Sequence, residues 1–591
     1  MKRCPECRRD YYDDTLLYCL DDGNALLEGP RSEPGAIATG FPSDEPQTAI
    51  LHSTASPGEA PTRAQIHTTE QTAVFPAGAE AEPQGNVSDS TAKQSFAARR
   101  AKPLAALVVA LVVLVGGFFG YRYFSASDSK QINSIAVMPF ENRNSDADTD
   151  YLSDGLAESV IFRLTQIPDL KVSPTSSVMR YKGASTDVAK IAAELGVDAV
   201  MTGRLTKRGD NLNITVELVD ARTNKSLWGE QYERKLSELL TTQREIVTEI
   251  VGKLQLKLSG ESEQKLAKNY TDNNEAYQLY LKGTYFTSKL TREGFLKGND
   301  YFEQAIRLDP NYAQAYNGIA YNQLAAMDWF SEPKVAGPKA KNAVEKAVSL
   351  DTSVAETQQL RGMVAHWVEW DWVGAEKAFK QAIALNPNGG YRPYGYYAWF
   401  LANMGRNEEA IAAATKGQHL DPVSAEANWY LGMTLLAAGK TEDAIARFQV
   451  AIDIDPTYFY AHSFLGRAYL QAGKKQEALT AFKKAHELES ENSENWGNLA
   501  YAHGVTENRK EAERIIQYLL DRSKTAYVAP YYLALAYAGL GDNEQTFKWL
   551  DLAYADKSDS LVLYLKADPQ LNGIRHDLRY RDLLKRMNLP E

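Results

Sequence analysis

Cysteine is scarce in this sequence, and all of it lies near the amino terminus. The 591 residues contain three cysteines, Cys4, Cys7 and Cys19. No disulfide can therefore form within the chain beyond Cys19. This distribution is typical of a protein whose first segment stays in a reducing compartment while the thiol-free remainder is exported.

Signatures of catalysis are also missing. The sequence has no G-x-x-x-x-G-K-[ST] phosphate loop, no H-E-x-x-H zinc motif, no G-x-S-x-G nucleophile elbow and no protein-kinase signature set. Histidines such as His366, His462 and His503 are scattered along the second half and do not group with a nucleophile. A catalytic site needs a nucleophile, a base and a stabilising group close together, so we expect the protein not to be an enzyme.

Positive charge is in deficit as well. The chain has 65 lysines and arginines against 76 acidic residues, a net charge of −11. A nucleic-acid-binding protein neutralises phosphates with a basic surface, so general nucleic-acid binding is not expected. Clustered Lys2, Arg3, Arg8 and Arg9 leave open a local contact with nucleic acid or a phosphoprotein, although a solvated surface is the favoured explanation, because several acidic residues lie beside them.

Long apolar runs are limited to one. No charged residue interrupts Pro103–Tyr121, and as a helix this run is about 28 Å long, close to the thickness of a bilayer's hydrocarbon core. It follows a long polar tract, unlike a cleaved signal peptide. We predict a single transmembrane helix over 101–124, with a buried core helix as the alternative.

The flanking charges predict how this helix is oriented. Lysine and arginine are enriched before the helix and sparse after it, which places the amino terminus in the cytoplasm and the domains after the helix in the periplasm. Gly116 and Gly120 form a small-xxx-small pair that would allow two such helices to dimerise.

The amino-terminal head, residues 1–28, carries the candidate metal ligands. Cys4 and Cys7 have the C-x-x-C spacing in which two thiolates reach one ion, and Cys19 with Asp22 supplies a third thiolate and a carboxylate. The segment resembles the zinc ribbons of bacterial signalling and membrane proteins, but Asp22 stands where a fourth cysteine is usual. The resemblance implies bound zinc; the alternative is a decayed ribbon without metal. Residues 29–100, rich in Pro, Ala, Gly, Ser and Thr, are predicted to be a disordered linker.

Alternating strand and helix patterns follow the predicted membrane helix and predict an α/β layer domain over 132–258. The stretches SIAVMPFENRNSDADTDYLSDGLAESVIFRLTQIPDLKV and ELGVDAVMTGRLTKRGDNLNITVELVDARTNKSLWGEQYERK resemble TolB amino-terminal-like (FlgO-like) domains of bacterial proteins. The resemblance implies a non-catalytic envelope or sensory module. We interpret Asp150, Asp154 and Glu158 as a solvated, acidic helix start and not as a metal or acid–base cluster.

The second half of the chain repeats itself. Five equivalent positions recur with a spacing of about 34 residues, which resembles tetratricopeptide repeats. These pairs are Gly432 and Gly466, Leu435 and Tyr469, Ala444 and Ala478, Phe448 and Phe482, and Ala451 and Ala485. We predict an α-solenoid of about eight repeats over 275–560, with an inserted loop near DWFSEP, and a cap over 561–591.

A solenoid of this kind presents a concave face that binds peptides or proteins. The repeat register places seven large side chains towards that face, and aromatic residues and arginine are the usual anchors of interfaces. The candidate partner-binding residues are Arg392, Trp399, Trp429, Tyr460, Arg467, Tyr501 and Tyr531. The alternative for each is packing between repeats.

The order of these parts predicts a membrane-anchored, non-enzymatic scaffold that binds protein partners through the solenoid. The alternative is a transmembrane signal transducer, in which a partner bound outside the membrane changes what the zinc-ribbon-like head contacts inside, in a pathway related to a kinase or to transcription.

Overall fold

The computed structural model describes residues 2–3, 10–11, 27–28, 132–144, 147–183, 187–256 and 258–590. They belong to two units, Met1–Val108 and Val109–Glu591, which we describe separately. The predicted linker over 29–100 and the predicted membrane helix over 101–124 lie outside the described residues. Within the described ranges, no helix is both long and apolar enough to cross a bilayer.

The first unit contains a small antiparallel sheet in the order β2-β1-β3. Its strands are β1 (Lys2–Arg3), β2 (Asp10–Tyr11) and β3 (Leu27–Glu28). Lys2 lies opposite Tyr11 on one side and Glu28 on the other. The pairing brings the two ends of the predicted head together.

A mixed sheet forms the centre of the α/β domain. Its order is β6-β4-β7-β8-β9, with β5 paired to β7. The strand β4 runs parallel to β6 and β7, whereas β7, β8 and β9 form an antiparallel meander. The strands are β4 (Ser134–Val137), β5 (Glu141–Asn142), β6 (Lys171–Val172), β7 (Ala199–Arg208), β8 (Asn211–Asp220) and β9 (Lys225–Lys235).

The helices α2 and α5 pack against this sheet and against each other, and β4 is buried on both of its faces. Residues alternate between buried and exposed along β8, and only Trp228 and Tyr232 are well buried on β9, so the other face of the meander meets solvent. The helices are α2 (Ala147–Leu164), α3 (Thr175–Met179), α4 (Val188–Leu195), η1 (Leu236–Glu238), α5 (Leu239–Lys253) and α6 (Gly260–Ala267).

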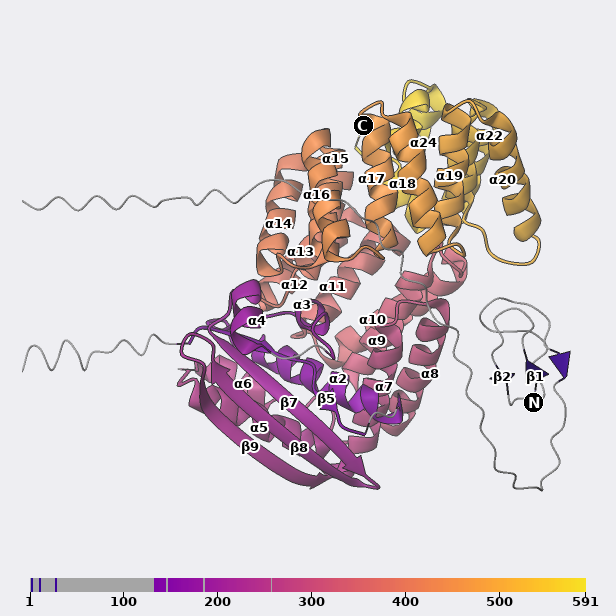
Figure 1. Ribbon diagram of the computed structural model, residues 1–591. Coiled ribbons are helices and arrows are strands. Elements are labelled where there is room, and N and C mark those ends of the chain that lie inside the picture. The colour runs from indigo at the N-terminus through magenta and orange to yellow at the C-terminus, as the bar shows by residue number, and fades with distance from the viewer. Residues whose placement is uncertain are drawn as a thin grey trace, which may run out of the picture. The chain divides into compact units, whose positions relative to one another are not determined.

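Paired antiparallel helices build the solenoid that follows, and each pair packs on the next (Figure 1). The first helices of the pairs are α7 (Asn274–Thr287), α9 (Ala313–Ala326), α11 (Ala355–Met363, extended by the π-helix η2, Val364–Glu369), α13 (Arg392–Asn403), α15 (Ala425–Ala437), α17 (Phe459–Gln471), α19 (Ser493–Val505) and α21 (Pro530–Gly539). The second helices are α8 (Arg292–Leu308), α10 (Pro333–Leu350), α12 (Trp372–Leu385), α14 (Asn407–Leu420), α16 (Thr441–Ile454), α18 (Lys475–Leu488), α20 (Arg509–Arg522) and α22 (Asn543–Ala555).

The recurring glycines and phenylalanines of the sequence meet inside these pairs. A Cβ atom on Gly432 would lie 2.6 Å from the ring of Phe448, and one on Gly466 would lie 2.6 Å from the ring of Phe482. Both phenylalanines are fully buried. The missing side chain of glycine therefore makes the space that the aromatic ring of the paired helix fills.

The chain ends with α23 (Asp559–Tyr564), η3 (Pro569–Ile574) and α24 (Leu578–Arg586). This C-terminal segment contacts the loop between α9 and α10, which belongs to the early part of the solenoid. Asp328 in that loop accepts hydrogen bonds from Tyr527 Oη at 2.6 Å, from the backbone nitrogen of Ser560 at 2.9 Å and from Ser558 Oγ. Repeats far apart in sequence are thus joined by one buried carboxylate.

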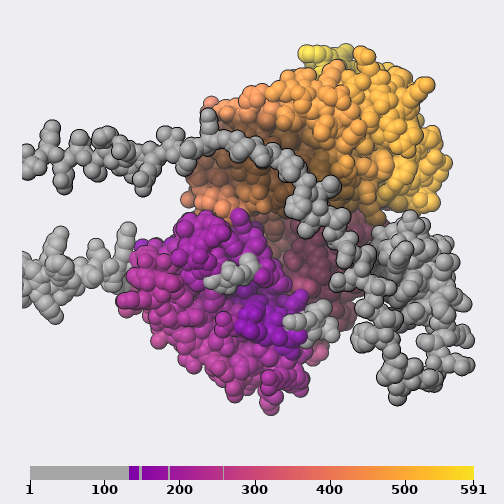
Figure 2. Space-filling model, viewed as in Figure 1, coloured from indigo at the N-terminus to yellow at the C-terminus, as the bar shows by residue number. Residues whose placement is uncertain are grey.

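The α/β domain borders directly on the solenoid in the space-filling view (Figure 2). Tyr277 on α7 donates a hydrogen bond to Ser159 Oγ at 2.8 Å. On a later repeat, the buried Asp421 accepts hydrogen bonds from Ser176 Oγ at 2.7 Å and from Ser177 Oγ. Contacts with two separate repeats fix the domain against the solenoid.

Candidate binding surfaces of the solenoid

Four of the seven side chains predicted to face a partner lie in the protein interior. The exposed fractions are 6% for Trp399, 4% for Trp429, 1% for Arg467 and 0% for Tyr531. In this conformation these four side chains pack inside the protein and do not reach solvent.

The C-terminal segment contacts Trp399, Arg467 and Tyr531, while Trp429 packs against Trp399 and Phe464. The indole of Trp399 donates a hydrogen bond to the backbone oxygen of Leu563 at 3.2 Å. The ring of Tyr564 lies 5.7 Å from the ring of Trp399, 5.8 Å from that of Phe464 and 6.1 Å from that of Tyr531. The segment from α23 to η3 therefore lies along the concave face, with α23 against α13 and η2 and with η3 against α17 and α21, much as a bound peptide would.

Arg467 holds this covering segment through charge. Its guanidinium donates to Glu494 Oε1 at 2.9 Å, lies 3.8 Å from Asp568 Oδ2, and stacks 4.5 Å from the centre of the Tyr564 ring. Tyr532 also donates to Glu494, and Tyr531 donates to Asp568 at 3.2 Å. Burial raises the pKa of Glu494, while the nearby Arg467 cation counteracts that rise. Such a buried and paired cluster stabilises one arrangement of the chain.

Arg392, Tyr460 and Tyr501 remain partly accessible. The side chain of Arg392 is 42% exposed and contacts Glu426 Oε2 at 3.0 Å, while its guanidinium lies 5.9 Å from the centre of the Tyr321 ring. Tyr460 and Tyr501 are half-buried. We call Tyr321, Arg392, Glu426 and Tyr460 the inner wall.

Glu158 is a residue that the sequence analysis misassigned to solvent. It lies on α2 and is half-buried. Burial raises the pKa of Glu158 to about 7, repulsion from Glu356 adds to the rise, and Arg392 opposes it. Its neighbours belong to α11 and α13, and no local sequence signal reports a contact between elements so far apart.

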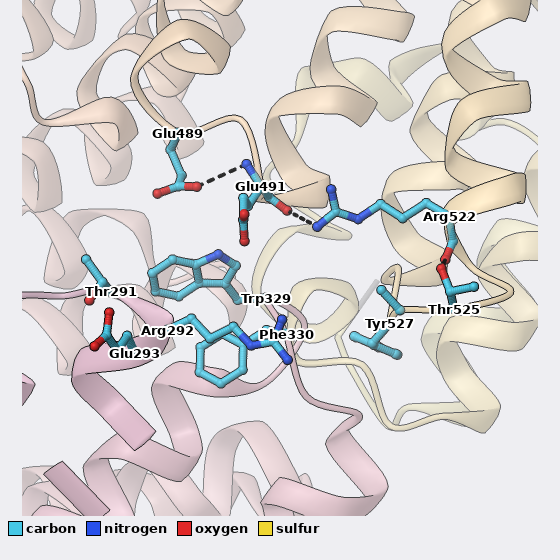
Figure 3. Close-up of a pocket in the computed structure, with 11 residues that line it drawn as sticks. Thr291, Arg292, Glu293, Trp329, Phe330, Glu489, Glu491, Arg522, Thr525 and Tyr527 are labelled. Carbon is cyan, nitrogen blue, oxygen red and sulfur yellow. Dashed lines mark hydrogen bonds between the residues drawn. The ribbon is translucent and has the colours of Figure 1, made fainter. Parts of the chain in front are cut away.

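A separate pocket lies between loops of distant repeats (Figure 3). Its volume is about 490 Å³. The lining comes from the start of α8, the loop after α9, the loop before α19 and the loop before α21. Its residues are Thr291, Arg292, Glu293, Trp329, Phe330, Glu489, Glu491, Arg522, Thr525, Ala526 and Tyr527. Trp329 and Phe330 belong to the inserted DWFSEP loop, whose two adjacent aromatic residues were the one sequence signal of this pocket.

The predicted zinc ligands Cys4, Cys7, Cys19 and Asp22 lie outside the described residues. Among the residues that the structure does describe, no group of three or more histidine, cysteine or acidic side chains is placed to hold a metal ion. The zinc site in the head therefore stays a prediction.

Family models match two parts of the chain. A model of the second domain of HilA/YgeH-like transcriptional regulators matches residues 130–249, which contain most of the α/β domain. Two tetratricopeptide-repeat models match residues 398–459 and 435–485 in the solenoid. The resemblance of the α/β domain to TolB amino-terminal-like domains stays a prediction.

Individual proteins are similar over part of the chain. A protein of Rhizobium meliloti (strain 1021), described as putative adenylate cyclase 3, is 28% identical over 240 residues, which are 40% of this chain and 40% of that protein. Among solved structures, YrrB, "a TPR protein with an unusual peptide-binding site", is 21% identical over 33% of this chain and 95% of its own, with a TM-score of 0.23. The type IV pilus biogenesis factor PilW is 17% identical over 41% of this chain and 92% of its own, with a TM-score of 0.27.

The matched models and the paired helices agree over residues 398–485. The chain therefore contains tetratricopeptide repeats.

Proposed function

We propose that this protein is a non-enzymatic scaffold that binds protein partners on the inner wall of its solenoid. The observation that carries the proposal is the partial exposure of Arg392 at the start of α13, paired with Glu426 beside Tyr321, whereas the C-terminal segment covers Trp399 further along the same helix. Aromatic residues and arginine anchor protein interfaces, and an arginine already paired with a carboxylate is pre-positioned for recognition.

Affinity purification of the full-length protein with charge-reversed variants tests this proposal. Arg392→Glu places two carboxylates together on the inner wall, so partners captured by the parent protein are expected to be lost. Arg514→Glu is the matched control, because Arg514 is an exposed arginine on α20, paired with Glu511. The proposal would be contradicted if the parent protein, Arg392→Glu and Arg514→Glu all retained the same partners and had equal thermal midpoints.

The scaffold is further proposed to be anchored in a membrane by residues 101–124, with the solenoid in the periplasm. The support is the uncharged run Pro103–Tyr121 and the charge difference across it. Protease treatment of spheroplasts is expected to digest the repeats and spare the first hundred residues. Protection of the repeats would place them in the cytoplasm.

A second candidate function is signal transduction across that membrane. It is favoured by the similarity of residues 130–249 to a domain of transcriptional regulators. Deletion of residues 1–28 separates the two candidates, because a scaffold keeps its function without the head, whereas a transducer loses its output while still binding partners.

A further inference from the structure

The pocket of about 490 Å³ lies apart from the inner wall and is lined by residues that the proposed function does not use. Its most prominent side chain is Trp329, which is half-buried. The indole is fixed by T-shaped contacts with Phe295 at 5.8 Å and Phe330 at 5.4 Å between ring centres. A fixed aromatic ring at the wall of a cavity is a pre-organised stacking surface.

The cations of the pocket already have partners within the chain. Arg522 donates to the backbone oxygen of Glu491 at 3.0 Å and to Tyr518 Oη at 3.2 Å. Arg292 lies with its guanidinium 5.7 Å from the centre of the Phe330 ring.

Two carboxylates line the pocket beside Trp329, one on the half-buried Glu489 and one on the exposed Glu491. Glu489 accepts a hydrogen bond from the backbone nitrogen of Glu491 at 3.1 Å. Within the described part of the chain, neither Glu489 nor Glu491 forms an ion pair through its carboxylate. Figure 3 shows both carboxylates on one side of the indole and Arg292 on the other. The pocket thus combines an aromatic surface with two carboxylates that lack a cation.

We propose that this pocket binds the guanidinium of an arginine side chain in a peptide. A planar guanidinium stacks on an indole and donates two parallel hydrogen bonds to a carboxylate, and the lining of this pocket contains both groups. The net charge of −11 also attracts a cationic ligand. The proposal is independent of binding on the inner wall, since the pocket shares no residue with it.

Fluorine NMR of the full-length protein labelled with 5-fluorotryptophan tests the proposal directly. The chain has nine tryptophans, and the resonance missing from Trp329→Phe identifies Trp329. Titration with acetyl-Gly-Arg-Gly-amide is expected to shift that resonance selectively. The isosteric peptide with citrulline, which lacks the charge, is expected to leave it unshifted.

Matched variants then test the carboxylates. Glu489→Gln with Glu491→Gln is expected to weaken binding about tenfold, the effect of losing a charge-assisted hydrogen bond. Glu477→Gln, an exposed change on α18, is expected to have no effect. The proposal is overturned if the citrulline peptide binds equally, if acetyl-Gly-Asp-Gly-amide binds instead, if the double variant binds unchanged, or if no shift occurs up to about 10 mM peptide, well above the dissociation constant of a weak complex.

Discussion

Single buried charges determine which parts of the concave face are open. Arg467 was predicted to face a partner, but it is 1% exposed and pairs with Glu494 and Asp568. Arg392 lies at the start of α13, whereas Arg467 lies about two turns into α17, and the side chain of Arg392 is 42% exposed. The sequence does not distinguish these two arginines, because both stand at inner positions of the repeat. The burial of Arg467 comes from the C-terminal segment, which contacts it through Tyr564 and Asp568.

Neutralising Glu494 should therefore be costly. Glu494→Gln leaves Arg467 buried with only the more distant Asp568, and a buried charge that loses its partner lowers the free energy of unfolding by about 3 to 5 kcal/mol. Urea denaturation measures the change. Glu442→Gln is the control, since Glu442 is 75% exposed and pairs with Lys474 at 3.6 Å; its effect should stay below about 1 kcal/mol. Equal effects of the two changes would contradict the assignment of a buried cluster.

The pKa of Glu158 gives a pH dependence with a defined sign. Its value in the folded protein is about 7, against an ordinary 4.5. Between these values the folded state binds more protons than the unfolded state, so the free energy of unfolding falls as the pH rises through this window. Thermal midpoints between pH 5 and 8 should therefore decrease less in Glu158→Gln than in the parent protein. Parallel curves for the two proteins would show that Glu158 has an ordinary pKa.

At the scale of elements, local patterns predicted the repeats because each repeat uses the same contact. Gly432 contacts Phe448, and Gly466 contacts Phe482, each within one helix pair. Because both partners of the contact recur together at the repeat period, the sequence repeat predicts the contact. The covering helix α23 could not be predicted in its place. Its residues Leu561–Tyr564 form a short apolar run that is equally compatible with another repeat, and the contact between Trp399 and Leu563 spans 164 residues.

A glycine-to-alanine substitution is expected to have opposite effects on stability in α17, where the glycine contacts a phenylalanine ring, and in α5, where the space beside the glycine is open. Gly466→Ala places a Cβ atom 2.6 Å from the Phe482 ring, and overpacking of this kind costs about 1 to 3 kcal/mol. Gly252→Ala in α5 meets no atom within 4 Å, so it should be neutral or stabilise the fold by up to about 1 kcal/mol. Thermal denaturation of both variants measures the difference. A stable Gly466→Ala protein would contradict the close packing of α17 on α18.

At the scale of the whole molecule, contacts between distant repeats decide what the solenoid can bind. Asp328 joins the α9–α10 loop to Tyr527, Ser558 and Ser560. The same loop carries Trp329 and Phe330 into the pocket. Closure of the repeats onto one another therefore builds the pocket and holds α23 in the concave face. The repeat period reports only contacts between neighbouring repeats. Neither the pocket nor the position of α23 could therefore be predicted from the sequence.

Removing the Asp328 carboxylate should loosen this closure. Asp328→Ala leaves the backbone nitrogen of Ser560 and the hydroxyls of Tyr527 and Ser558 without their acceptor. Hydrogen exchange is expected to quicken in 558–564 and in the α9–α10 loop, while the strands β7 and β8 keep their protection. Unchanged exchange in 558–564 would show that α23 is held without Asp328.

The central claim is that partners bind on the inner wall, and site-specific photo-crosslinking tests it most directly. The photoreactive residue p-benzoylphenylalanine replaces Tyr460 on the inner wall or, as a control, Tyr518, which is 38% exposed on the second helix of its pair. The account predicts a crosslinked protein partner from position 460 that is lost with Arg392→Glu, and none from position 518. Crosslinking from position 518 alone, or from position 460 regardless of Arg392, would contradict it.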